Sequence, residues 1–321
     1  MKTIGWGIVG CGNVTEVKSG PAFQRAENSR LVAVMRRDAA KAEDYARRHN
    51  IEKWYGKASE LINDPEVDMV YIATPPSSHK KYALMAAAAG KPAYVEKPMG
   101  LNYAECKEMN DAFDKAGLPL FVAYYRRALP RFLTIKSWID DGKIGDPRFV
   151  NVVFHQPPSE TDLKEIQNWR TQPEISGGGY FVDLGSHTLD ILQFYFGDII
   201  FAEGRAANQA GMYPAEDIVS GRFIFASGVQ GTGIWCFSSG TRLDRTEIVG
   251  DRGKISFATF GNDPVILETP QGVQQFDLPN PIHIQQPLIQ TIVDQLNGRG
   301  KCPSTGTTSA RTNWAMDRLM G

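Results

Sequence analysis

Short apolar runs alternate with helical stretches along residues 1–123 of the chain. Helices are predicted at Ala39–His49 and His79–Ala89, and a glycine follows the second as a helix stop signal. Such alternation is the pattern of a doubly wound parallel sheet, an α/β fold in which strands are joined by crossover helices. The five predicted strands are Ile4–Val9, Leu31–Met35, Val67–Thr74, Ala93–Val95 and Leu120–Ala123.

The pattern changes after Tyr124, where strand-like runs are separated by turn signals such as Ser227-Gly228. Runs of this kind predict an antiparallel-rich α+β domain, so we expect two domains, at 1–123 and 124–321. The strands predicted for the second domain are Arg148–His155, Phe201–Asn208, Asp217–Phe225, Val229–Phe237, Thr246–Val249 and Lys254–Phe257. Its predicted helices are Ala128–Asp141, Tyr180–Phe196, Ile284–Leu296 and Ser309–Leu319.

Length and composition narrow the class of protein. A chain of 321 residues exceeds one ordinary core, which agrees with two domains. The net charge of −1 argues against nucleic acid, which needs a basic face. No apolar run approaches the ~20 residues that span a bilayer, and the N-terminus enters a strand pattern without a signal-peptide core. We therefore expect a cytoplasmic protein with neither a nucleic-acid nor a membrane partner.

A glycine-rich turn follows the first predicted strand and opens a helix. Gly10 would make the tight turn, and Gly12 would let the backbone approach a pyrophosphate at a helix N-terminus. Thr15 stands where the Gly-x-Gly-x-x-Gly fingerprint has its third glycine, so a plain strand–turn–helix is the alternative. Position and context favour dinucleotide binding, with Gly10, Gly12, Asn13 and Val14 as cofactor contacts.

The run Arg36-Arg37-Asp38 ends the second predicted strand. In dinucleotide-binding folds an acidic residue ~20 positions past the motif bonds the ribose 2′-hydroxyl. Position 36 lies 21 residues past Thr15 and is an arginine. Paired arginines can accept a 2′-phosphate and stack on adenine, which predicts a preference for NADP(H), with NAD(H) possible. The alternative is that Arg36 and Arg37 face solvent and Asp38 serves NAD.

Two turns that contain proline are predicted to lie at the cofactor. Thr74-Pro75-Pro76 would stiffen a turn under it, and His79 would contact the nicotinamide ribose or serve only as a helix N-terminal residue. Glu96-Lys97-Pro98 ends the fourth strand, at the edge where open α/β sheets bind ligands. Glu96 and Lys97 are therefore predicted to reach the cofactor. The alternative for Lys97 is that it is one of 35 Lys and Arg residues on a solvated surface.

The segment Gly177–Asp190 places a carboxylate and an imidazole four positions apart. Asp183 and His187 would share one face of a helix, with Asp190 three positions further on. Gly185 inside a helix costs roughly 1 kcal/mol against alanine, which suggests that something approaches the backbone closely. A solvated polar face, a metal pair and general acid–base chemistry are the three interpretations. The other histidines form no ligand motif, so we expect no metal and favour acid–base chemistry.

These segments together resemble the glucose–fructose oxidoreductase/inositol dehydrogenase/rhizopine catabolism (Gfo/Idh/MocA) family. The resemblance rests on the glycine-rich N-terminus, Ala89–Pro98 and Gly177–Asp190, and includes Tyr124–Arg127 and Gly142–Gly145. It implies a Rossmann domain followed by an α+β domain with a large, open, mostly antiparallel sheet. It also implies a homo-oligomer, which we expect to be a dimer or tetramer formed through that sheet.

The resemblance further implies a nicotinamide-dependent enzyme with the catalytic residues Lys97, Asp183 and His187. We expect hydride transfer between nicotinamide and a sugar, polyol or related cyclic alcohol or ketone. Lys97 and His187 would act on the reacting oxygen while Asp183 orients the imidazole, and which of the first two carries the proton is open. A glycosidase that uses bound NAD(P) for transient oxidation and a non-catalytic cofactor-sensing regulator are the alternatives within this fold.

Five further residues are secondary candidates. Trp169 and Arg170, in a loop before the reacting helix, would reach the nicotinamide or form only a surface stack. Tyr124 follows the fifth strand at the domain junction. His155 and Trp235 lie on strands and would line a sugar site, with strand packing as the alternative. The predicted substrate contacts are Lys97, Tyr124, His155, Asp183, His187 and Trp235.

Overall fold

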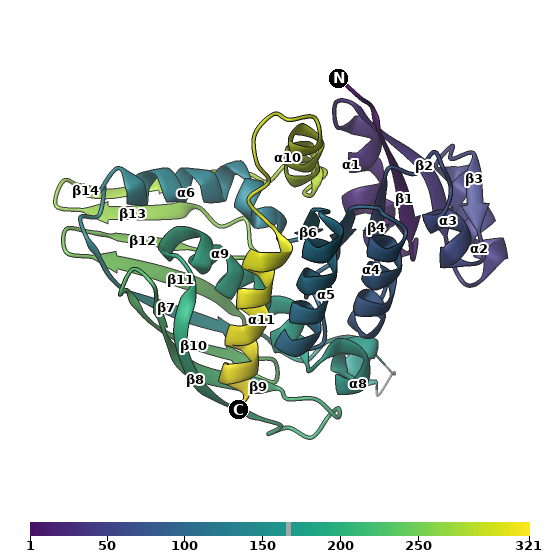
Figure 1. Ribbon diagram of the computed structural model, residues 1–321. Coiled ribbons are helices and arrows are strands. Elements are labelled where there is room, and N and C mark those ends of the chain that lie inside the picture. The colour runs from purple at the N-terminus through teal and green to yellow at the C-terminus, as the bar shows by residue number, and fades with distance from the viewer. Residues whose placement is uncertain (165–167) are drawn as a thin grey trace. The chain divides into compact units, whose positions relative to one another are not determined.

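The computed structural model describes residues 1–164 and 168–321 and divides the chain into two compact units (Figure 1). The first unit comprises Met1–Leu129 and Pro281–Ala310, and the second comprises Pro130–Asn280 and Arg311–Gly321. Contacts therefore group residues 281–310 with the first unit, whereas the sequence analysis grouped them with the second domain. The boundary at residue 123 and the roles assigned to the two domains stay predictions.

The first unit is built on a six-stranded parallel sheet. The strand order β3-β2-β1-β4-β5-β6 is that of a doubly wound dinucleotide-binding sheet. The predicted parallel α/β fold is confirmed, and the short strand β3 adds to the five predicted strands. The strands are β1 (Ile4–Val9), β2 (Ser29–Met35), β3 (Lys53–Tyr55), β4 (Met69–Ile72), β5 (Ala93–Val95) and β6 (Leu120–Val122).

Local signals set the ends of helices in the first unit. The Asp38 carboxylate accepts the Lys41 N–H at the start of α2, and the Asn102 side chain accepts the Glu105 N–H at the start of α5. Gly117 ends α5 in the left-handed conformation. The helices are η1 (Thr15–Ser19), α1 (Gly20–Arg25), α2 (Ala39–Arg48), α3 (Ala58–Ile62), η2 (Pro76–Ser78), α4 (His79–Ala88), α5 (Tyr103–Ala116), η3 (Tyr125–Ala128) and α10 (Gln286–Leu296).

The second unit is built on an eight-stranded sheet with the order β14-β13-β12-β11-β7-β10-β9-β8 (Figure 1). Its neighbouring strands are antiparallel, except that β10 runs parallel to β7. The predicted large, mostly antiparallel sheet is confirmed, with β13 and β14 as additions. The strands are β7 (Pro147–His155), β8 (Ile199–Ala207), β9 (Ile218–Phe225), β10 (Gln230–Cys236), β11 (Leu243–Gly250), β12 (Lys254–Phe257), β13 (Val265–Thr269) and β14 (Gly272–Phe276).

One face of this sheet packs on helices and the other is open. Trp235 is fully buried on the covered face of β10, whereas the neighbouring Ile234 is 39% exposed on the other face. The helix predicted at Tyr180–Phe196 is observed as a π-helical segment, η5, followed by α9. The helices are α6 (Pro130–Asp140), α7 (Glu160–Leu163), η4 (Trp169–Thr171), α8 (Pro173–Ser176), η5 (Phe181–Gly185), α9 (Ser186–Phe196) and α11 (Gly306–Met320). The first five residues of α11 group with the first unit.

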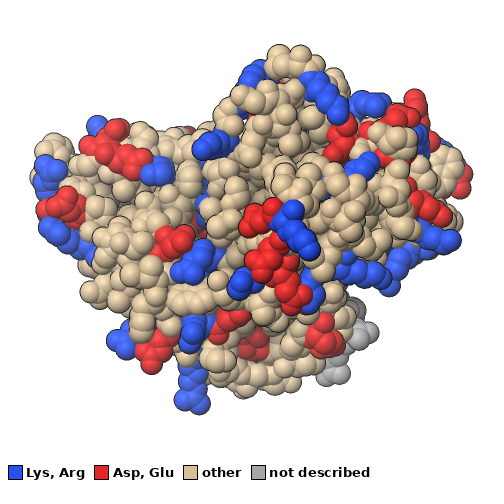
Figure 2. Space-filling view, viewed as in Figure 1, with Lys and Arg blue, Asp and Glu red and all other residues tan. Residues whose placement is uncertain are grey.

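Charges of both signs are interspersed on the face shown in Figure 2. The net charge of the chain is −1. Among the helices of residues 1–164 and 168–321, none combines the length and the apolar character needed to cross a membrane.

Candidate functional site

The glycine turn after β1 forms as predicted. Gly10 has a φ of 93°, and a Cβ at this position would lie 2.6 Å from Thr74 Cγ2, so only glycine fits. The N–H groups of Gly10 and Cys11 donate to the Met35 carbonyl at 2.9 and 3.1 Å, which joins the turn to β2. The nearest neighbour of a Cβ on Gly12 would be 3.9 Å away, so this part of the turn is open.

Thr15 closes the turn with its hydroxyl. Its Oγ1 accepts the Gly12 N–H at 3.0 Å and donates to the Gly12 carbonyl at 2.8 Å. The Tyr45 hydroxyl donates to the Thr15 carbonyl at 2.8 Å, and a Cβ on Gly20 would lie 2.2 Å from that carbonyl oxygen. Gly20 therefore permits a close approach of the kind that the third glycine of the fingerprint provides. Sequence reasoning missed Gly20, although a glycine directly before Pro21 is an available signal.

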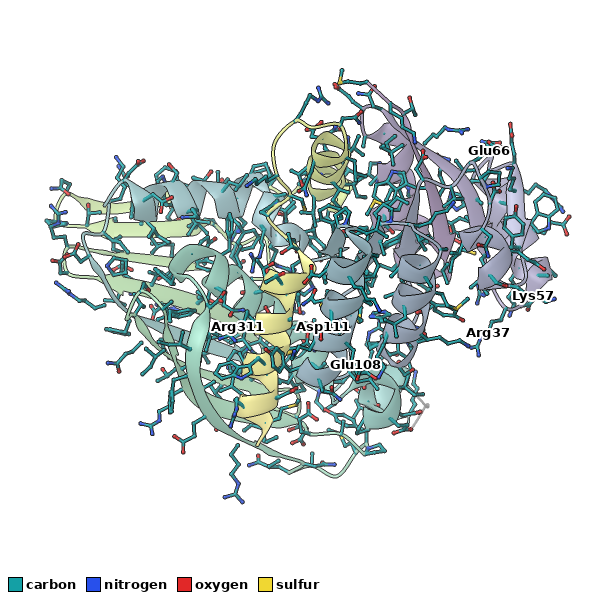
Figure 3. The ribbon with its side chains drawn as sticks, viewed as in Figure 1. Arg37, Lys57, Glu66, Glu108, Asp111 and Arg311 are labelled. Carbon is teal, nitrogen blue, oxygen red and sulfur yellow. The ribbon has the colours of Figure 1, made fainter. Side chains whose placement is uncertain are left out.

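The acidic residue after β2 is engaged by its own helix. Asp38 accepts the Lys41 N–H at 3.3 Å and lies 3.5 Å from Lys41 Nζ. Arg36 and Arg37 are exposed, and Figure 3 shows Arg37 extending outward from the first unit. Burial raises the pKa of the Cys11 thiol to about 11, and the positive charge of Arg36 opposes this rise. Arg36 therefore lies close enough to the glycine turn to act on it electrostatically.

His79 joins two turns at the carboxyl ends of the strands. It is fully buried, with Nε2 2.7 Å from the Thr74 carbonyl oxygen and Nδ1 2.9 Å from the Pro98 carbonyl oxygen. Burial lowers the pKa of the imidazole, and the two carbonyls oppose this change. Pro75 is exposed while Pro76 is buried. Both ring nitrogens of His79 face protein carbonyls. His79 therefore acts on a cofactor by fixing the backbone of the turns at Thr74 and Pro98.

Glu96 is held inside the first unit. Its Oε1 accepts the Tyr71 hydroxyl at 2.5 Å and the Gln285 amide at 2.7 Å, and its Oε2 accepts the Lys97 N–H at 3.2 Å. Only 8% of Glu96 is exposed, so these donors compensate a buried carboxylate. The Lys97–Pro98 peptide bond is cis, and Lys97 is half-buried. Glu96 thus fixes the backbone that carries Lys97.

The glycines before the reacting segment pack against Glu216. Gly177 ends α8 with a φ of 85°, and the Gly179 N–H donates to Glu216 Oε1 at 2.7 Å. A Cβ on Gly179 would lie 2.5 Å from the Glu216 carbonyl oxygen. Burial raises the pKa of the Glu216 carboxyl. Sequence reasoning missed Glu216, because a single glutamate 37 positions from its partner leaves no local signal.

Asp183 lies in the π-helical segment η5 and pairs with an arginine. Arg170 Nε donates to Asp183 Oδ2 at 3.1 Å, and the Arg170 guanidinium lies over the Trp169 ring, 4.4 Å from its centroid. The structure therefore brings two predicted cofactor contacts next to a predicted catalytic carboxylate. A π-helical turn is wider than an α-helical turn, so the spacing of Asp183 and His187 is not the α-helical i,i+4 relation that the sequence analysis assumed.

His187 lies in the first turn of α9 and is 3% exposed. The ring of Phe260 packs against it, with centroids 5.9 Å apart and ring planes at 77°. Asp190, three positions on, is buried and accepts a hydrogen bond from α11 at 3.3 Å. The sequence analysis expected a group to approach the backbone at Gly185. That group is the Phe181 ring of η5 itself, which would lie 2.5 Å from a Cβ on Gly185.

The remaining candidates occupy different environments. Tyr124 is fully buried in the core of the first unit. Trp235 packs against Phe181 with ring centroids 5.0 Å apart, and therefore supports η5. His155 lies on the open face of the sheet opposite Leu243, and its Nδ1 is 2.8 Å from a backbone carbonyl oxygen. The structure brings Trp235, and not His155, next to the reacting segment. Their roles as substrate contacts stay predictions.

The fold and these residues define a class of protein. A doubly wound sheet with an open glycine turn after β1 and exposed arginines after β2 is suited to a dinucleotide. The second unit supplies a carboxylate and a buried imidazole, groups that serve proton transfer. Within residues 1–164 and 168–321, no group of three or more His, Cys, Asp or Glu side chains is arranged to hold a metal ion. The class is a dinucleotide-dependent oxidoreductase with a second, open-sheet domain.

The chain belongs to the Gfo/Idh/MocA family of oxidoreductases. The family model described as an oxidoreductase family with an NAD-binding Rossmann fold matches residues 4–124. The model of the GFO/IDH/MocA C-terminal domain matches residues 132–256. The resemblance drawn from the sequence is therefore confirmed, and the protein is an NAD(P)-dependent oxidoreductase.

Three known proteins illustrate the similarity. Oxidoreductase P35 of Formosa agariphila is 40% identical over 319 residues, which cover 99% of this chain and 98% of that protein. The trans-1,2-dihydrobenzene-1,2-diol dehydrogenase of Bos taurus is 30% identical over 85% of this chain and 80% of its own length. The solved structure of an aldose-aldose oxidoreductase from Caulobacter crescentus matches with a TM-score of 0.86 at 23% identity, covering 99% of this chain and 96% of that chain.

Proposed function

We propose that the protein is an NADP(H)-dependent oxidoreductase that transfers a hydride between nicotinamide and a carbon of a sugar, polyol or related cyclic alcohol or ketone. The name of the bovine relative supports the substrate class, because it describes a cyclic vicinal diol. Such a diol shares with sugars and polyols a reacting CH–OH group that has a second hydroxyl beside it.

The cofactor assignment depends on the residues at the carboxyl ends of the parallel strands. The open glycine turn fits a pyrophosphate, and bound nicotinamide would accept or supply the hydride. The residues that we propose to hold the cofactor are Gly10, Gly12, Asn13, Val14, Arg36, Arg37, Thr74, Pro75, Pro76, His79, Glu96, Lys97, Trp169 and Arg170. Among these, His79 and Glu96 act through the backbone that they fix.

The catalytic assignment uses Lys97, Asp183 and His187. Lys97 donates to the reacting oxygen and stabilises developing alkoxide charge. In the oxidation direction His187 takes the hydroxyl proton, and Asp183 orients the imidazole. Arg170 in turn holds the Asp183 carboxylate in place. The proposed substrate contacts are these three catalytic residues together with Tyr124, His155 and Trp235.

The observation that carries the NADP(H) preference is the capping of α2 by Asp38. A carboxylate that accepts the Lys41 N–H and pairs with Lys41 Nζ is engaged away from a ribose hydroxyl. Arg36 and Arg37 remain exposed at this strand end. Arg36→Asp should lower the ratio of NADP to NAD affinity by about 10- to 100-fold, since one charge-assisted hydrogen bond is lost. Fluorescence titration with both reduced cofactors measures the ratio.

The matched control is Arg30→Asp. Arg30 is an exposed arginine near the start of β2, and its guanidinium pairs with Glu66 at 3.4 Å. This variant should keep the wild-type ratio. An unchanged ratio in Arg36→Asp would show that the NADP(H) assignment is wrong.

The substrate class is tested by a panel of aldoses, ketoses, inositols and anhydro-sugars with NADPH and NADP⁺, followed by nicotinamide absorbance. Activity confined to compounds outside this panel would contradict the proposal.

We further propose that the protein forms a homodimer or homotetramer through the open face of the eight-stranded sheet. Large apolar side chains exposed on this face support the assignment: Phe149, Phe201, Ile234 and Leu243.

A further inference from the structure

We propose that Asp244 is a positioning residue for His187, acting through the turn at Thr259–Gly261 and the ring of Phe260. The inference rests on the function proposed above for His187, and it uses contacts inside the second unit alone.

Asp244, near the start of β11, binds three successive backbone N–H groups. Its Oδ1 accepts the Thr259 N–H at 2.9 Å, and its Oδ2 accepts the N–H groups of Phe260 and Gly261 at 2.6 and 3.2 Å. Successive backbone N–H groups around one anion form a compact nest, and a charged acceptor strengthens each hydrogen bond. The carboxylate therefore fixes the path of the chain shortly after β12.

The turn held by Asp244 contacts the reacting helix through Phe260 and Thr259. The Phe260 ring packs against the His187 imidazole, with centroids 5.9 Å apart, and Thr188 Oγ1 donates to Thr259 Oγ1 at 3.3 Å. The Phe260 ring also packs against Phe154 of β7, with centroids 5.4 Å apart. Phe260 is thus confined between a core strand and the imidazole, so a displaced turn would change the surroundings of His187.

A buried arginine holds the same loop from α6. Arg131 is 1% exposed, and its Nη2 donates to the Asp263 carbonyl at 2.7 Å. Burial lowers the pKa of the guanidinium, and the charges of Asp244 and Asp263 oppose this change. The positive charge of Arg131 in turn offsets the cost of keeping the Asp244 carboxylate partly buried. The loop is therefore held by Asp244 at the turn and by Arg131 two residues beyond Gly261.

The position of His187 matters because proton transfer requires hydrogen-bond geometry between the imidazole and the reacting group. A displacement of about 1 Å can cost ~10²-fold in rate. An edge-to-face aromatic contact restricts the rotation of the imidazole and gives it one defined environment. Asp244 supplies these effects without touching the substrate, which is why we describe it as a positioning residue.

The test uses the purified full-length protein. Asp244→Ala should lower kcat by about 10- to 100-fold while KM for the cofactor stays within about twofold. Asp244→Asn keeps one oxygen acceptor and should recover part of this loss. Phe260→Leu keeps the backbone hydrogen bonds of the turn but removes the ring, and should also lower kcat. In nitrogen–proton NMR spectra of the imidazoles, the His187 signal, assigned with His187→Asn, should shift in Asp244→Ala and in Phe260→Leu.

Asp251→Ala is the matched control. Asp251 follows the other end of β11, and its Oδ1 accepts one backbone N–H, that of Asp146, at 2.8 Å. This variant should leave kcat and the His187 signal unchanged. An equal loss of kcat in Asp251→Ala would overturn the inference, because the effect would then be a general weakening of the sheet.

An unchanged His187 signal in folded Asp244→Ala and Phe260→Leu would overturn the positioning role even if the oxidoreductase activity is present. Wild-type turnover of His187→Asn would instead overturn the proton role of His187 in the proposed function. The NMR spectra of Asp244→Ala would still show whether Asp244 positions the His187 imidazole. If Asp244→Ala does not fold, Asp244→Asn decides the question by the same two measurements, because it weakens the carboxylate contacts of the turn and keeps the Phe260 ring.

Discussion

Lys97 is the residue on which the proposed chemistry depends most. Its backbone N–H donates to Glu96, whose carboxylate also accepts from Tyr71 and Gln285. Removing one donor from a buried carboxylate leaves charge uncompensated, so the network resists rearrangement. These hydrogen bonds hold the strand end in place within the first unit. Such preorganisation is what makes a positively charged donor effective against developing negative charge.

Lys97→Met should lower kcat at least ~10²-fold, because the donor to the reacting oxygen is lost while the side-chain volume is nearly kept. The affinity for NADPH, measured by fluorescence titration, should stay near wild type. Lys107→Met makes the same change on the exposed surface of α5 and should leave both quantities unchanged. Wild-type turnover in Lys97→Met would remove Lys97 from the catalytic residues.

At the scale of elements, two helices of functional interest begin as π-helical segments, η1 and η5. π-helical turns occur frequently at functional sites. In both cases a glycine stands where the segment ends, and a close neighbour occupies the space of its absent Cβ. For Gly20 the neighbour is the Thr15 carbonyl, and for Gly185 it is the Phe181 ring. The glycines therefore permit tight local packing at the phosphate turn and at the reacting segment.

Gly20→Ala should destabilise the protein by about 1–3 kcal/mol, since the added methyl would overlap the Thr15 carbonyl and the Tyr45 hydroxyl. Urea unfolding measures this loss, and the dissociation constant of NADPH should rise with it because the phosphate turn is displaced. Gly56→Ala is the control in the same unit: its Cβ would lie 3.6 Å from Ala39 Cβ, an ordinary contact. Equal stability of the two variants would contradict the packing argument.

At the scale of the whole molecule, the open face of the eight-stranded sheet carries several exposed apolar side chains. Ile234 pairs in register with Val153, and Leu243 lies opposite His155, so neighbouring strands contribute to one patch. Ile234 and Leu243 are 39% and 38% exposed. Contiguous exposed apolar surface of this kind marks interaction sites. A second copy of the same chain, related by two-fold symmetry, is the occupant that we propose.

Ile234→Lys should shift the protein towards the monomer, because an ammonium group would be buried against apolar side chains of the partner copy. Size-exclusion chromatography with light scattering measures the mass in solution. Ile282→Lys changes an isoleucine that is 90% exposed and lies outside the sheet, and should leave the assembly unchanged. If wild type and both variants have the same mass, the sheet face is not the assembly interface.

Several features of the fold and the site followed from the sequence. The strands β1, β2, β4, β5 and β6 were predicted because buried parallel strands are continuous apolar runs. The edge strands β3 and β14 were missed, since their residues are half-buried or exposed and show no apolar periodicity. The turn at Gly10 was predicted because a glycine-rich motif follows an apolar run, and the positive φ of Gly10 in the structure explains why glycine stands there. Each of these signals lies within a few neighbouring residues.

The sequence by itself determined the parallel and antiparallel halves, the glycine turn, the arginines after β2 and the position of Lys97 at a strand end. Only the tertiary structure decided the long-range partners. Gln285 binds Glu96 from 189 positions away, and residues 281–310 group with the first unit. Asp244 binds the turn at Thr259–Gly261, and Arg170 binds Asp183. Such partners leave no local pattern in the chain, because packing in three dimensions, and not spacing along the sequence, selects which groups meet.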